Sequence, residues 1–234
     1  MPPPPRPDFL RHRFGAALWL DLTAGFVEMI GLVGLHGLLP VQVAVNAPLA
    51  IAAWSQTGQD FVARTLAIPV FILVTALASR ALSRAGHGIR LASGHLLFFQ
   101  CLLLMGAMAV GVLLGPFPRS DAPAAVAAGL LLVSAMALQG VGAAWLWRER
   151  LSLVSTFDLA RLSIRMGRGV CRGRDVSPQL MRLGAFIVGA GVAALVFPIA
   201  GFWSLGLAAA GSLVTLFHFV PFDFARAFAD VGRR

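Results

Sequence analysis

Apolar residues run along most of the chain in six long stretches that short polar gaps separate. An α-helix needs about 20 mainly apolar residues to cross the hydrocarbon core of a bilayer, and each stretch is of that length. The stretches are residues 16–38, 62–82, 92–115, 123–147, 180–200 and 202–221. The pattern predicts an all-α membrane protein with six transmembrane helices.

Composition supports a membrane domain. Hydrophobic residues make up 58% of the chain and charged residues only 12%, where a soluble domain carries about 25% charged residues. In lipid the backbone must satisfy its own hydrogen bonds, which favours helices. We therefore expect one transmembrane domain at 16–221, with a cytoplasmic N-terminal tail at 1–15 and a cytoplasmic C-terminal tail at 222–234.

The net charge of +9 comes from arginine without any lysine, and its distribution predicts the orientation. Arginines gather in alternate gaps, as expected when cytoplasmic loops retain positive charge. With both termini inside, only Arg64 and Arg119 lie outside. The inside set is Arg6, Arg11, Arg13, Arg80, Arg84, Arg90, Arg148, Arg150, Arg161, Arg165, Arg168, Arg172, Arg174, Arg182, Arg226, Arg233 and Arg234. This bias requires an even number of spans.

The basic run Arg161–Arg174 has two interpretations. It could bind RNA or a regulator, but retention at the anionic cytoplasmic leaflet accounts for the charge more simply. We expect the lipid bilayer as partner, with anionic lipid at the arginine-rich inner loops and no nucleic acid. Whether the protein forms a homodimer stays open.

Two segments do not fit a simple count of helices. Residues 39–56 contain Pro40 and Pro48, each of which lacks a backbone donor and discourages a continuous helix. We interpret this segment as a re-entrant or interfacial half-helix on the outer side, with an ordinary outer loop as the alternative. The second segment, residues 149–168, has apolar residues near one face, which predicts an amphipathic helix at the inner interface.

The two halves of the chain have similar polar positions. Glu28 in the first stretch is followed 18 positions later by Asn46, and Gln139 in the fourth is followed 19 positions later by Asp158. Each half then holds three spans, at 16–115 and 123–221. Because three is odd, the halves would have opposite orientations, an arrangement common in secondary transporters. The sequence thus predicts two inverted three-helix repeats.

These positions carry a family resemblance. Residues 24–28 read Ala-Gly-Phe-Val-Glu, similar to the Ala-Gly-Tyr-Val-Asp stretch of the YoaK-type family of bacterial membrane proteins. A Thr-Gly-Asn element of that family would fall on 44–46, where only Asn46 remains, and on 156–158. Gln139 and Gly140 stand where the family tends to have Gln-Asn.

The resemblance extends from Trp19 to Phe219, as in a divergent member. It implies a six-span protein of the bacterial inner membrane and supplies no activity, because the family forms a domain of unknown function.

Candidate site residues are polar groups within or next to the spans. Asp21 and Glu28 are seven residues apart, which places them on one face of a helix. A charged group at bilayer depth is costly and is a functional candidate by default. We expect a substrate or ion pathway with Glu28 as the proton- or cation-coupling group. The full set is Asp21, Glu28, Asn46, Gln139, Thr156 and Asp158.

The structural alternative is that Glu28 and Gln139 form an interhelical hydrogen bond that fixes packing, while Asp21 reaches water near the interface. We expect no enzyme, because phosphate-loop, zinc-protease and serine-hydrolase motifs are missing from the sequence. We likewise expect no cofactor and no metal site. The leading hypothesis is a small-solute or ion transporter that works by alternating access of the two repeats. The alternative is a structural or regulatory membrane protein whose basic loop binds lipid or a partner.

Overall fold

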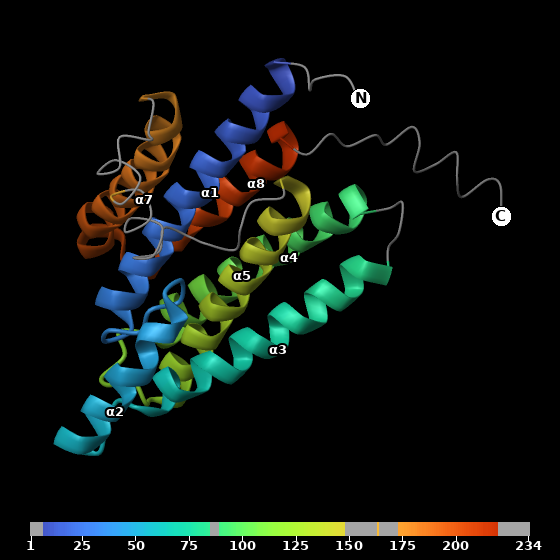
Figure 1. Cartoon of the computed structure of the whole chain (residues 1–234). Coiled ribbons are helices and arrows are strands. Elements are labelled where there is room, and N and C mark those ends of the chain that lie inside the picture. Colours follow the sequence, from blue (N-terminus) through green and yellow to red (C-terminus); the bar gives the residue numbers. More distant parts are fainter. Residues whose placement is uncertain (1–6, 85–88, 148–162, 164–172, 220–234) are drawn as a thin grey trace.

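The computed structural model describes residues 7–84, 89–147, 163 and 173–219, and within these ranges the regular elements are all helical (Figure 1). The all-α prediction is confirmed for this part of the chain. The predicted amphipathic helix at 149–168 lies almost wholly outside the described residues. The elements are α1 (Pro7–Gly34), η1 (Val43–Val45), α2 (Asn46–Thr57), α3 (Val62–Arg84), α4 (Ile89–Leu114), α5 (Pro123–Trp147), α7 (Gly173–Ala200), η3 (Gly201–Ser204) and α8 (Leu205–Phe219).

Several of these helices have the length and composition of membrane spans. Five described stretches qualify, namely Gly15–Gly34, Val62–Arg84, Gly94–Leu114, Pro123–Ala144 and Gln179–Phe217. The last is 39 residues long and contains η3 together with most of α7 and α8. Gly201, which begins η3, has a φ of 54°, a left-handed conformation that glycine adopts without steric cost. The chain turns between α7 and α8 (Figure 1).

The first helix ends four residues before the predicted span does. α1 stops at Gly34, and the two residues His36 and Gly37 have φ values of 54° and 87°. A right-handed helix cannot continue through such residues, and a left-handed residue commonly marks a helix end. The apolar residues Leu35 and Leu38 remain buried, so they belong to the core although they are not helical.

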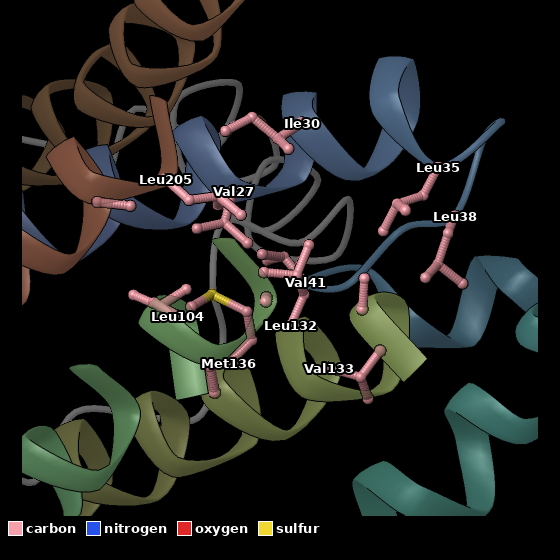
Figure 2. Close-up of a cluster of buried hydrophobic side chains, with 14 of the residues drawn as sticks. Val27, Ile30, Leu35, Leu38, Val41, Leu104, Leu132, Val133, Met136 and Leu205 are labelled. Carbon is pink, nitrogen blue, oxygen red and sulfur yellow. The ribbon is translucent and has the colours of Figure 1, made fainter. Parts of the chain in front are cut away.

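The core lies where α1 and α5 meet the other helices. α1 packs mainly against α7 and also against α8, whereas α5 packs against α4 and α3, and α4 also contacts α8. Figure 2 shows Val27 and Ile30 of α1 in one cluster with Leu132 and Met136 of α5. α3 and α7 instead expose large apolar side chains, among which Ile199 is 89% exposed. Such surfaces suit contact with lipid.

Glycines allow α1 and α7 to approach closely. A Cβ atom added to Gly25 would lie 1.9 Å from the carbonyl oxygen of Phe186, and one added to Gly189 would lie 2.0 Å from that of Leu22. Small residues permit this backbone contact between membrane helices. The α1–α7 contact therefore depends on two positions that accept no side chain.

α1 begins and α8 ends at the same end of the bundle, and α2 lies at the opposite end (Figure 1). At the α2 end, Asp60 accepts hydrogen bonds from the backbone and hydroxyl of Ser120, both at 2.9 Å. Asp121 in turn accepts bonds from the backbone N–H groups of Phe61 and Val62. These contacts join the start of α3 to the loop before α5.

Candidate functional site

The carboxylate of Glu28 binds the backbone of the loop that follows α1. Its two oxygens accept hydrogen bonds from Val41 N–H at 2.7 Å and from Gln42 N–H at 3.2 Å. Glu28 is buried. Because loop residues lack the hydrogen bonds of a helix, an acidic side chain that accepts from them offsets the cost of burying their N–H groups.

Asn46 holds the same loop at Leu39. Its carboxamide oxygen accepts from Leu39 N–H at 3.0 Å, and its amide nitrogen donates to Leu39 C=O at 2.8 Å. Asn46 is the first residue of α2 and is fully buried. One side chain thereby satisfies both polar backbone groups of Leu39.

The loop returns along α1 before α2 begins. Residues 38–41 lie against the helix, and a Cβ added to Gly31 would approach the Pro40 ring to 2.5 Å. Val41 reaches the core between Val27 and Leu132 (Figure 2). The segment predicted as a re-entrant half-helix or an outer loop is thus a returning chain followed by a short helix. In the returning chain Pro40, Val41 and Val43 are buried, whereas Gln42, Ala44 and Val45 are exposed. We call residues 35–46 the return loop.

Asp21, two turns before Glu28, pairs with an arginine of α7. Arg182 donates from Nε to the Asp21 carboxylate at 2.6 Å and from Nη2 at 3.3 Å. The Asp21 side chain is 2% exposed and that of Arg182 is 22% exposed. The pair links α1 to α7 next to the glycine contact, on the side toward the start of α1. Asp21 was expected to reach water in the structural alternative, but the structure buries it.

Gln139 belongs to a cluster of uncharged polar groups from four helices. Its Oε1 accepts from Gln100 Nε2 of α4 at 2.7 Å, and its Nε2 donates to Leu20 C=O of α1 at 2.9 Å. Gln100 Nε2 also donates to Ser212 Oγ of α8 at 3.0 Å. Gln100, Gln139 and Ser212 are buried. We call these three side chains and the Leu20 carbonyl the amide cluster.

One acceptor in the amide cluster has no hydrogen bond within the described part of the chain. Gln100 Oε1 is buried and has no partner among the described residues. Buried polar atoms are nearly always hydrogen-bonded, so such an atom calls for an explanation.

The return loop is also tied to α3 and to the loop before α5. Arg64 donates from Nη2 to His36 C=O at 2.6 Å, and His36 Nε2 lies 2.9 Å from Phe117 C=O. Arg64 was expected to be one of two arginines outside. In the structure Arg64 holds the left-handed turn at His36 and Gly37.

The predicted site residues thus separate into two places. Glu28 and Asn46 meet at the return loop, whereas Asp21 and Gln139 lie at the interior, where Gln139 binds the residue that precedes Asp21. The structural alternative expected a hydrogen bond between Glu28 and Gln139. In the structure Glu28 instead accepts from Val41 and Gln42, and Gln139 bonds to Gln100 and Leu20. Thr156 and Asp158 lie outside the described residues. No group of three His, Cys, Asp or Glu side chains in the described ranges lies close enough to hold a metal ion.

Sequence reasoning missed Gln100, Ser212 and the pairing role of Arg182. Gln100 had a usable signal, because it is a carboxamide near the middle of an apolar stretch, as Gln139 is. Ser212 gave little signal, since a hydroxyl in a membrane helix commonly bonds to its own backbone. Arg182 was counted only as a loop charge.

The chain matches the model of a known protein family. The family described as "Protein of unknown function (DUF1275)" matches residues 16–218. No curated protein and no solved structure matches the chain. The YoaK-type resemblance agrees with this result, because the YoaK-type proteins are in the same family. Since the match covers almost all of the helical region, the chain belongs to the DUF1275 family.

Proposed function

We propose that this protein is a transporter for a small solute or ion, built from two inverted halves that move against each other across the bacterial inner membrane. The first half is α1, α3 and α4, and the second is α5, α7 and α8. Both termini are cytoplasmic in this proposal, and the six helices each cross the membrane. The observation that carries it is the amide cluster, in which buried polar groups of α1 and α4 from the first half bind those of α5 and α8 from the second.

The packing of the helices supports two related halves. If α1, α3 and α4 are exchanged for α5, α7 and α8, the α1–α7 contact becomes the α5–α3 contact, and α1–α8 becomes α5–α4. The α4–α8 and α1–α5 contacts map onto themselves. A pseudo-two-fold axis in the membrane plane would produce this pattern, and transporters with such repeats bind solutes between the halves.

We further propose that Glu28 couples proton movement to opening of the return loop. An ionised carboxylate accepts bonds from both Val41 N–H and Gln42 N–H. Protonation places an O–H group on one of the two carboxyl oxygens. That O–H group then faces a backbone N–H group, which is also a donor, so one of the two hydrogen bonds is lost. Protonation thereby loosens the return loop. In this proposal the loop, while bound to Glu28, closes the α2 end of the contact between α1 and α5.

The test is proton-coupled flux through purified protein in liposomes. Glu28→Gln preserves the shape of the side chain, but its carboxamide neither gains nor loses a proton at the pH of the assay. We expect flux to fall by about tenfold, the scale of one lost charge-assisted hydrogen bond, and to lose its dependence on pH. Gln42→Ala is the matched control, because Gln42 uses its backbone N–H in this contact and its side chain is exposed.

Two results would contradict the proposal in different ways. A folded Glu28→Gln protein with unchanged, pH-dependent flux would remove the coupling role. Wild-type protein that moves no solute or ion, yet binds vesicles of anionic lipid through its basic loop, would favour a structural or regulatory protein.

A further inference from the structure

The amide cluster leaves one buried acceptor without a donor from the described part of the chain. Gln100 Nε2 has two hydrogens and uses them on Gln139 Oε1 and Ser212 Oγ. The Ser212 hydroxyl donates to Ala208 C=O of its own helix at 3.0 Å, and Gln139 Nε2 donates to Leu20 C=O. Gln100 Oε1 receives no donor from the described residues. The missing partner is therefore an N–H or O–H group.

The position of the cluster fits a solute site. Gln139 follows Glu28 by 111 positions, and Ser212 follows Gln100 by 112 positions, so Gln100 and Ser212 are equivalent in the two proposed repeats. Equivalent positions touch each other only at a two-fold axis, and these two side chains are hydrogen-bonded. The cluster thus lies where the halves meet, which is where repeat transporters hold their substrates.

The charges of the region select the kind of solute. The cluster consists of two carboxamides, a hydroxyl and a carbonyl, none of which is ionised. The neighbouring charge on α1, Asp21, is paired with Arg182. An ion in the cluster would lack a countercharge inside the membrane, where uncompensated charge is costly.

We infer that Gln100, Gln139 and Ser212 form a site for a small neutral solute that donates an N–H or O–H hydrogen bond to Gln100 Oε1. This inference rests on the proposed transport function and specifies its substrate class. Urea, acetamide and glycerol have the required donors and no charge.

The experiment measures the uptake of urea, acetamide and glycerol, with choline and acetate as charged probes, by light scattering of proteoliposomes. Gln100→Leu removes the acceptor, and Ser212→Ala removes a partner that orients it. The matched control is Ser134→Ala, because Ser134 also bonds to a carbonyl four residues earlier but lies outside the cluster. We expect neutral-solute uptake to fall by about tenfold in Gln100→Leu, as when one buried hydrogen bond is lost, and to be unchanged in Ser134→Ala.

A second readout separates this inference from the transport function. The melting temperature of detergent-purified protein is measured with and without acetamide. A rise in the melting temperature of the wild type with acetamide that disappears in Gln100→Leu supports the site. If the same wild-type protein shows no flux, the site stands and the proposed transport function is wrong.

Flux of charged probes alone, or neutral uptake that is equal in wild type and Gln100→Leu, would overturn the site and leave transport standing. Absence of both flux and melting shift would overturn both. If Gln100→Leu does not fold, Gln100→Asn and Ser212→Ala decide in its place, and wild-type behaviour in both would overturn the site.

Discussion

The return loop and the amide cluster both bury polar side chains, but these side chains serve different partners. At the return loop, Glu28 and Asn46 bond to backbone groups of residues 39–42 that no helix satisfies. In the amide cluster the surrounding backbone is helical, and Gln100 and Gln139 bond to each other. An irregular chain within a membrane protein requires partners of the first kind. The second kind has no such structural requirement, so it is the better candidate for contact with a solute.

The comparison implies that the interior depends on close approach of helices, whereas residues 39–42 of the return loop depend on Glu28 and Asn46, which are close to them in sequence. Gly189→Val tests this and should have the largest effect. The added side chain would meet the backbone of Leu22, so α7 must move from α1 and the Asp21–Arg182 pair must break. We expect loss of the monodisperse species in size-exclusion chromatography. Gly191→Ala on the same helix is the control, since nothing lies within 4 Å of its Cβ position.

Arg182→Ala should have the next largest effect. It removes two hydrogen bonds from a carboxylate that is 2% exposed, and breaking a buried ion pair by removal of one partner costs roughly 3–5 kcal/mol. The melting temperature in detergent should therefore fall clearly. The double variant Asp21→Asn with Arg182→Gln keeps hydrogen bonding without charge and should recover most of the loss. A double variant as unstable as Arg182→Ala would show that the charges themselves are needed.

Asn46→Leu should have a smaller and more local effect. It leaves the N–H and C=O groups of Leu39 without their side-chain partner, at a cost of about 1–3 kcal/mol for each buried group left unsatisfied. Hydrogen exchange should speed up at residues 39–42, and exchange of α4 and α5 should stay slow. Equal acceleration in the interior helices would show that the two regions are one cooperative unit.

The apolar pattern predicted the helices well because a membrane span has a length and composition that sequence reports directly. Predicted spans 62–82 and 123–147 correspond to α3 and α5 within two residues at each end. The prediction was less accurate at the end of α1, since a left-handed turn at His36 and Gly37 depends on Arg64, which is far along the chain.

The role of the candidate site residues as a substrate or ion pathway stays a prediction. Their position within apolar stretches singled out Asp21, Glu28 and Gln139, and the structure buries all three. Their partners could not be assigned from spacing, because Arg182, Gln100 and Ser212 reach them only through contacts between helices. The count of six crossings, the repeats and the orientation remain predictions.

Sequence alone determined that this chain is helical and apolar and which of its polar groups lie within the apolar stretches. Helix formation and burial in lipid depend on local composition, so no fold is needed to read them. The tertiary structure decided which polar groups meet, with Glu28 at a backbone loop and Gln139 at a second carboxamide. Those pairings depend on how the helices pack against one another, and that packing is set by close approach at positions such as Gly25 and Gly189.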